Sequence, residues 1–182
     1  MILFTTAFAA VLGVQETLVE RVVAVVGDQV ITLTEVEETA RIIWIAQGGA
    51  PQSVDSVPAS VRDTVLGYLI DQAVIGQFVV RYGYEGTSKI SREANLQSFV
   101  DKFESRDAYE AFMRRFQIDE DEVVRLFKRQ GRNQAFLRER GRLRLLAAGS
   151  SIDSSALQSA MDDAFVEMKA QLKIVRSEVT GR

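Results

Sequence analysis

The sequence predicts a mainly α-helical protein, a bundle of about six helices with a small N-terminal β-hairpin. Apolar residues recur at spacings of three and four along most of the chain, which is typical of helices that pack on a core. Only two prolines occur, Pro51 and Pro58, so long helices are easily accommodated elsewhere. Two short runs of β-branched residues flank a glycine near the start. The 182 residues are enough for one domain with its own core.

The opening hairpin is predicted from Val22–Val26 and Val30–Thr32, whose residue types have high β-propensity. Between these runs, Gly27 and Asp28 can supply the positive φ angles of a tight turn. The tail LKIVRSEV is also compatible with a strand. A C-terminal strand could therefore join the hairpin.

The helices are predicted where a capping residue precedes an apolar periodic run. The expected openings are Thr34 with Glu37, Ser60 with Asp63, Asp107 with Glu110, and Asp119 with Glu122. Gly48-Gly49 and Gly83 are placed to stop the first two helices. The expected helices run from Thr34 to about Gln47, Ser60 to Gly83, Arg92 to Phe103, Asp107 to Phe116, Asp119 to Ala148, and Ser154 or Ser155 to Leu172.

The composition excludes several classes of chemistry. The chain has no histidine and no cysteine, which removes His-based triads, thiol nucleophiles, disulfides and most zinc sites. No phosphate-binding glycine loop or nucleophile elbow occurs. The paired carboxylates Glu37-Glu38 and Asp119 to Glu122 lie in expected first helical turns, where the helix dipole favours them, so we interpret them as capping groups. The sequence predicts no catalytic residue, no cofactor and no metal, and hence no enzyme.

The first residues, MILFTTAFAAVLGVQ, form an apolar run of about the length of a signal-peptide core. The run is too short to span a bilayer as a helix. We expect residues 1–15 to be a secretory signal, cleaved between Ala9 and Gln15, although no Lys or Arg precedes Arg21. The alternatives are a start that lies upstream and an N-terminal helix that packs on the body of the protein.

Basic residues gather in the longest expected helix, with Glu139 as the opposing charge. They are Arg125, Lys128, Arg129, Arg132, Arg138, Arg140, Arg142 and Arg144. One interpretation is a solvated amphipathic helix whose arginines pair with acidic neighbours. The other is an electrostatic surface for nucleic acid or anionic lipid. The net charge of -3 favours the first and predicts no nucleic-acid partner.

Aromatic side chains cluster in the fourth expected helix and the start of the fifth. The third and fourth helices are too short to bury every apolar group against each other, so some of this surface is expected to line a groove. Grooves with Met and aromatic side chains accept varied apolar peptides. The residues predicted to bind peptide are Tyr109, Phe112, Met113 and Phe116.

Two stretches resemble a known family. ERVVAVVGDQVITLTEVEE, residues 20–38, looks like the opening of the SurA-type periplasmic chaperones: a strand, a tight turn, a second strand and a capped helix. VRDTVLGYLIDQAVIGQFVVRYGYEGTSKIS, residues 61–91, is similar to the central helix of that family and its "KIS" connection. DAYEAFMRRFQID, residues 107–119, followed by an arginine-rich helix, is a looser match. Together these matches span roughly residues 20–152.

The resemblance implies residues 16–182 as a single SurA N-terminal-like domain, with a C-terminal helix, 155–176, that returns to the core. It implies a periplasmic holdase for unfolded outer-membrane or secreted proteins, which needs no stable membrane insertion. Many relatives insert a parvulin-type prolyl isomerase domain before the last helix. Here only SSIDS stands at that point, with no room for about ninety residues of isomerase, so isomerase activity is not implied. The alternative is a scaffolding protein with one specific partner, and a dimer is compatible with either.

Overall fold

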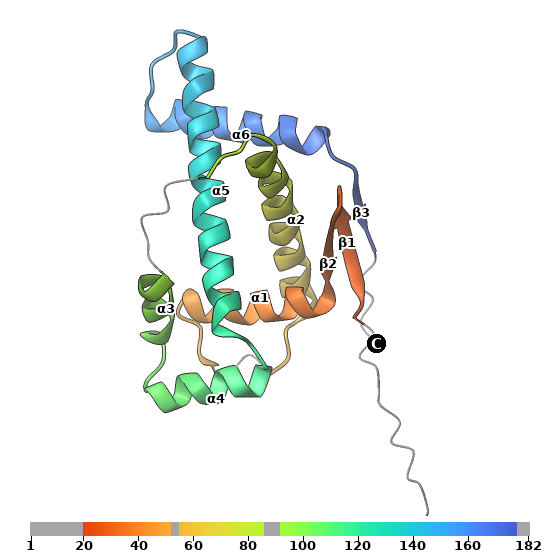
Figure 1. The fold of residues 1–182 in the computed structure, drawn as a ribbon, viewed down its shortest axis with the longest axis vertical. Helices are drawn as coiled ribbons and strands as arrows, with labels where there is room; N and C mark the ends of the chain where they lie inside the picture. Colours follow the sequence, from red (N-terminus) through yellow and green to blue (C-terminus); the bar gives the residue numbers. More distant parts are fainter. Residues whose placement is uncertain (1–19, 52–54, 86–91, 178–182) are drawn as a thin grey trace, which may run out of the picture.

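The computed structural model describes residues 20–51, 55–85 and 92–177 and confirms the predicted fold class: six helices and a small sheet (Figure 1). The opening residues, on which the signal peptide is predicted, lie outside the described residues. The elements in order are β1 (Val22–Val26), β2 (Gln29–Thr32), α1 (Leu33–Ala46), α2 (Ala59–Arg81), α3 (Arg92–Val100), α4 (Arg106–Phe116), α5 (Glu120–Ala147), α6 (Ser154–Ala170) and β3 (Ile174–Arg176).

The sheet joins the two ends of the described chain. Its order is β2-β1-β3, and both neighbours of β1 are antiparallel to it. Val25 lies opposite Val30 on one side and Val175 on the other. Figure 1 shows β3 beside the hairpin. The predicted C-terminal strand is therefore confirmed, and the hairpin holds the returning end of the chain.

The hairpin turn needs glycine for two reasons. Gly27 has a φ of 59°, which disfavours side chains with a Cβ atom. A Cβ atom at Gly27 would also lie 2.5 Å from Nε2 of Gln77. That amide donates hydrogen bonds to the carbonyl oxygen of Val26 and to Oδ1 of Asp28. The turn is thus tied directly to the C-terminal part of α2.

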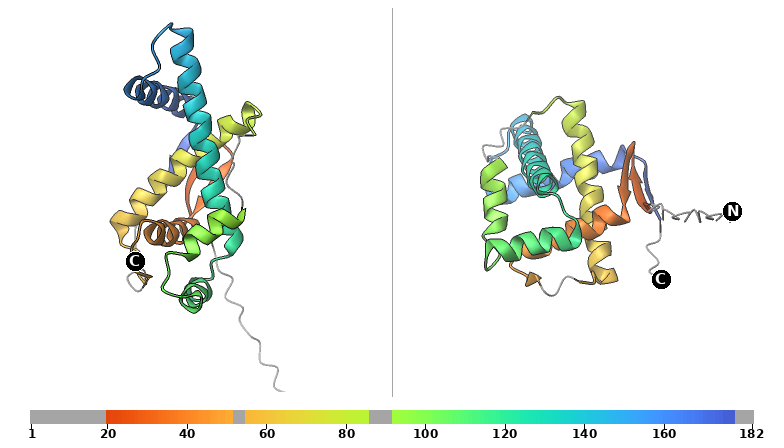
Figure 2. Two further views of the ribbon diagram at one scale, coloured as in Figure 1. Left: turned by 90° about the vertical axis from the view of Figure 1, so that its left-hand side faces the viewer. Right: turned by 60° about the horizontal axis from the view of Figure 1, so that its bottom comes forward.

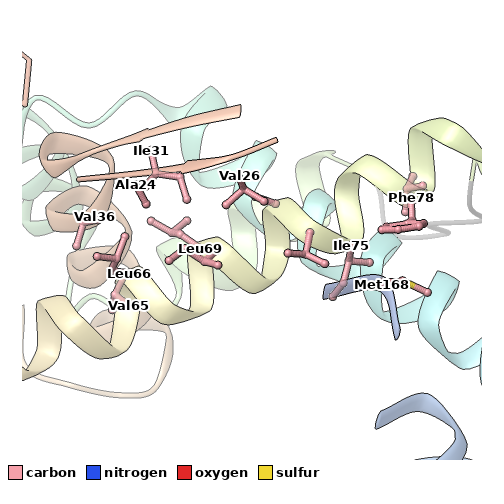
Figure 3. Packing of buried hydrophobic residues seen from close by; sticks show 14 of the residues in the cluster. Ala24, Val26, Ile31, Val36, Val65, Leu66, Leu69, Ile75, Phe78 and Met168 are labelled. Carbon is pink, nitrogen blue, oxygen red and sulfur yellow. The ribbon is translucent and has the colours of Figure 1, made fainter. Parts of the chain in front are cut away.

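The first core lies between the sheet and α2. Figure 3 shows Ala24, Val26 and Ile31 of the hairpin beside Leu66 and Leu69 of α2. Ala164 and Met168 of α6 belong to the same buried cluster, so the last helix packs on the N-terminal core. The helix α6 ends at Ala170, and the chain then forms the strand β3. The prediction of a C-terminal helix over residues 155–176 is therefore wrong at its end.

A second core lies at the other end of α1, where α1 meets α3, α4 and the start of α5. Its buried side chains are Ile42, Ile45, Phe99, Phe103, Tyr109, Phe112, Met113, Ile118, Val123 and Leu126. The start of α1 contributes Val36 and Ala40 to the first core. Since α1 contributes to both cores, a movement of α1 affects both.

Two predicted N-caps are each wrong by two residues. Thr32, not Thr34, caps α1: its Oγ1 accepts a hydrogen bond from the backbone N–H of Glu35 at 3.2 Å. Strand pairing reaches Thr32 and leaves it extended, which is the backbone geometry an N-cap requires. Ser105, not Asp107, caps α4 and accepts from the N–H of Ala108 at 3.1 Å.

Two other helix ends also differ from the prediction. α2 begins at Ala59 after Pro58, with no side-chain cap, so Ser60 and Asp63 do not form its N-terminus. Pro58 suits this place because its fixed φ matches the helix entry. α3 ends at Val100 rather than at Phe103. The prediction for α5 is confirmed, since Asp119 accepts from the N–H of Asp121 at 2.8 Å.

Candidate functional site

The structure buries three of the four predicted peptide-binding residues. Tyr109, Phe112 and Met113 have only 1%, 5% and 8% of their surface exposed. The reason is α3, together with the turn after it: Phe99 and Phe103 cover the aromatic face of α4. These three side chains therefore belong to the second core rather than to an open groove, and their binding of peptide stays a prediction.

Phe116, the fourth predicted residue, is half-buried and lines a hollow of about 360 Å³ between the start of α1 and the end of α4. Its ring lies beneath two guanidinium groups, those of Arg41 at 4.7 Å and Arg115 at 5.4 Å. Tyr109, by contrast, donates a hydrogen bond from its hydroxyl to Oε1 of Glu120 at 2.8 Å. Burial and this hydrogen bond raise the pKa of Tyr109 above its ordinary value. These contacts are those of a structural cluster that closes the α4–α5 corner.

An apolar groove lies at the opposite end of α5, where the end of α2 meets α5 and α6. Figures 1 and 2 show α4 at one end of α5 and the connection to α6 at the other. We call this cavity of about 290 Å³ the α2–α5–α6 groove. Its lining residues are Phe78, Tyr82, Arg140, Leu143, Arg144, Ala164, Glu167, Met168 and Gln171.

The floor of the groove is buried and its lips are exposed. Phe78, Ala164 and Met168 have 6% exposure or less and belong to the first core. Tyr82 and Leu143 keep 55% and 45% of their surface exposed. An apolar group that enters the groove therefore meets a preformed apolar floor and displaces water from two further apolar side chains.

The local sequence at the end of α2 fixes the position of Tyr82, one of the two exposed lips. Tyr82 is the C-cap residue of α2, and Gly83 follows with a φ of 60°. The N–H of Tyr84 donates to the carbonyl oxygen of Val79, which closes the helix in the manner of a Schellman motif. The Tyr82 ring stacks on Phe78 with centroids 6.3 Å apart. The predicted stop at Gly83 is confirmed, and it sets where this aromatic lip stands.

Charged side chains form the rim. The guanidinium of Arg140 lies 4.8 Å from the centre of the Tyr82 ring. Arg144 Nη1 and Glu167 Oε2 form an ion pair at 2.8 Å that joins α5 to α6 across the groove. The hydrogen bond from Arg144 lowers the pKa of Glu167 below its ordinary value. The Arg144–Glu167 pair is therefore ionised at neutral pH and places charge at the edge of the groove.

A second cavity, of about 510 Å³, separates α1 from α5 and is strongly charged; we call it the α1–α5 cavity. Arg129 and Glu35 form an ion pair across it at 3.3 Å. Glu38 and Glu122 both line it. Burial, followed by the proximity of Glu122, raises the pKa of Glu38 to about 7. The capping interpretation thus holds for Asp119 but does not account for this pair of glutamates.

Some of the basic residues of α5 form the ion pairs that the amphipathic interpretation predicts. Arg125 pairs with Glu122 at 3.0 Å, and Arg142 pairs with Glu139 at 2.7 Å. With the pairs that Arg129 and Arg144 make, these contacts neutralise much of the run locally. Four of the eight basic residues thus pair with carboxylates of α5 itself, α1 or α6.

In a comparison with known proteins, no protein-family model matches the chain, and no curated protein matches it. Among residues 20–51, 55–85 and 92–177, no helix is both long and apolar enough to cross a bilayer. Within the same residues, no three or more acidic side chains gather in a way that could hold a metal ion.

Proposed function

We propose that the protein is an exported, non-catalytic chaperone that binds extended apolar segments of unfolded polypeptides, with outer-membrane or secreted proteins as its clients. The α2–α5–α6 groove is the binding site. The observation that carries the proposal is the pairing of a buried apolar floor with two exposed apolar lips, Tyr82 and Leu143. Exposed apolar surface of this kind next to a preformed hollow is typical of sites that accept apolar groups.

The groove is small and has room for about one apolar side chain of a longer polymer. Its volume of about 290 Å³ lies at the lower end of the range of about 300–1,000 Å³ that is usual for small-molecule pockets. An extended polypeptide can place one apolar side chain on Phe78 and Met168 while its neighbours lie along the lips. Burial of apolar area supplies the free energy, at roughly 25 cal/mol per Å².

Binding at such a site is weak and tolerant of sequence. An unfolded client loses conformational entropy when it is captured, and that loss offsets much of the gain from burial. Met168 in the floor can repack around client side chains of different shape. A holdase needs this combination, because it must release each client for folding elsewhere.

The family resemblance of residues 20–38 and 61–91 supports the same proposal. The arrangement that it implies is a hairpin, a capped helix and a returning C-terminal segment. The sheet order β2-β1-β3 and the packing of α6 on the first core are consistent with that arrangement. Export to the periplasm is part of the proposal through this resemblance and through the apolar start of the sequence.

A matched pair of leucines in α5 tests the proposal. Leu143 lines the groove and is 45% exposed, whereas Leu146 is 52% exposed and does not line it. Burial of a whole leucine side chain contributes about 1.5–3 kcal/mol, so the exposed part of Leu143 can contribute about 1 kcal/mol to client binding. L143S is expected to weaken the affinity about fivefold.

The measurement is suppression of aggregation of an unfolded outer-membrane protein, together with its affinity by fluorescence anisotropy. We expect wild type and L146S to suppress aggregation equally and L143S to need several-fold more protein. If wild type gives no suppression at several-fold molar excess, the holdase function is refuted. If L143S and L146S are equally impaired, the groove is not the binding site.

A further inference from the structure

Two arginines lie over the aromatic rings of the α2–α5–α6 groove. The guanidinium of Arg81 is 4.6 Å from the centre of the Phe78 ring, and that of Arg140 is 4.8 Å from the centre of the Tyr82 ring. Phe78 belongs to the buried floor, and Tyr82 is one of the exposed lips. The cation–π attraction holds such a guanidinium near the ring, while the N–H groups at its edge stay able to donate hydrogen bonds.

Within residues 20–51, 55–85 and 92–177, neither Arg81 nor Arg140 forms an ion pair with a carboxylate. The sequence gives the reason for Arg140. The residues three and four positions away from it on α5 are a phenylalanine, two leucines and Arg144, so its own helix offers it no acidic partner. The side chain is therefore held at the groove with its hydrogen-bonding capacity unused by the described residues.

The acidic side chains of α6 and α2 near the groove act on other cations. Glu167, the one acidic residue among the described groove-lining residues, forms its ion pair with Arg144 at 2.8 Å. The charge of Asp163 also acts on Arg144. Asp71 of α2 pairs with Lys169 of α6 at 2.9 Å. The apolar floor is thus bordered by positive charge that the described carboxylates do not bind.

We infer that the groove selects client segments in which an ionised carboxylate lies close to the buried apolar side chain, and that Arg140 binds this carboxylate. The inference rests on the proposed function of the groove and adds the chemistry of the segment that the groove accepts. The carboxylate belongs either to an acidic side chain of the client or to its C-terminus. Arg81 adds a second positive charge beside the floor.

The spacing of the floor and the lip suits an extended client. The ring centroids of Phe78 and Tyr82 are 6.3 Å apart. In an extended chain, residues two positions apart lie on the same side at a separation of about 7 Å. An apolar client side chain on Phe78 therefore places an acidic side chain two positions away at the level of Tyr82, where Arg140 lies. Arginine and carboxylate then form charge-assisted hydrogen bonds.

Peptides of one length test the inference, each with one leucine as its large apolar residue. Three have an amidated C-terminus and carry glutamate, glutamine or lysine two positions from the leucine. A fourth carries glutamine there and ends in a free carboxylate two positions after the leucine. NMR titration into the isotope-labelled protein, followed at the Leu143 amide, gives the dissociation constants.

We expect the glutamate peptide to bind about threefold more tightly than the glutamine peptide, because solvent weakens an ion pair at this lip. The lysine peptide should bind most weakly, and high salt should reduce the difference. Tighter binding of the fourth peptide than of the amidated glutamine peptide shows that a chain terminus also supplies the carboxylate.

The variant R140Q tests the assignment, with R138Q as the matched control. Arg138 is exposed on the same helix and does not line the groove. The ratio of the glutamate and glutamine dissociation constants is compared, because a change in folding affects both peptides alike. We expect R140Q to remove the preference, R140K to keep part of it, and R138Q to keep it in full.

Equal binding of the glutamate and glutamine peptides by the wild type would overturn the inference and leave the proposed function standing. A preference that R140Q retains in full would also overturn it, because the carboxylate then binds elsewhere. If none of the peptides shifts the Leu143 amide, the inference fails, and suppression of client aggregation decides separately whether the protein is a holdase.

Discussion

A substitution of Phe112 tests directly whether the aromatic cluster of α4 is part of the core or binds clients. The side chain is 5% exposed, and its ring centroid lies 5.0 Å from that of Phe116 and 5.3 Å from that of Phe103. The structure therefore assigns it to the second core, whereas the sequence predicted that it binds clients. The substitution F112A separates these two roles.

The expected loss follows from burial and from the rigidity of the neighbours. Phe→Ala in a core costs about 3–5 kcal/mol, and the cost falls when the surroundings can collapse into the space. Phe116 and Phe127 beside the site are only partly buried, so we expect about 3–4 kcal/mol. That is a large share of the total stability of about 5–15 kcal/mol that is typical of a domain. F112L keeps most of the volume and should cost under about 1.5 kcal/mol.

Urea unfolding followed by circular dichroism measures the free energy of unfolding, and client affinity is measured on the same samples at low urea. We expect F112A to lower the unfolding free energy and F112L to keep wild-type client affinity. A loss under about 1 kcal/mol for F112A, combined with a loss of client affinity for F112L, would show that Phe112 faces the client and would refute the core assignment.

Two further predictions concern pairs of glycines and use the urea midpoint. G27A should cost more than G83A. Both positions have positive φ, of 59° and 60°, and the left-handed backbone alone costs about 1–2 kcal/mol. Only at Gly27 would the new Cβ also displace the Gln77 amide from its hydrogen bonds to Val26 and Asp28. In α5, G131A should stabilise by about 0.5–1 kcal/mol through helix propensity, whereas G141A should destabilise, since its Cβ would lie 3.1 Å from the backbone nitrogen of Met161 in α6. Equal effects within either pair would contradict the packing described for these sites.

The fold could be predicted because its signals are local. β-branched runs around Gly27, apolar spacing along each helix and the strand-compatible tail each depend on a short stretch of sequence. The N-cap of α1 was harder to predict for a physical reason. The stretch TLTEVE, residues 32–37, contains two overlapping capping patterns, Thr32 with Glu35 and Thr34 with Glu37. Only the length of the strand pairing decides which threonine is extended, and that depends on the partner strand.

The site could not be predicted in the same way, because it depends on contacts between distant segments. Helical spacing shows that α4 has an apolar face but not that Phe99 and Phe103 cover it. The groove combines Tyr82, Leu143 and Met168 from three helices, and no local motif relates these residues. The one signal in the sequence was the spacing of Phe78 and Tyr82, which continues the apolar stripe of α2 to its exposed end.

Site-specific photocross-linking tests the central claim most directly. A photoreactive amino acid replaces Leu143 in one variant and Leu146 in another, and each variant is irradiated with an unfolded outer-membrane protein. The groove predicts strong cross-links from position 143 and few from position 146, with competition by an excess of unlabelled client. Equal cross-linking from both positions, or cross-links that appear only when the photoreactive group replaces Phe116, would contradict it.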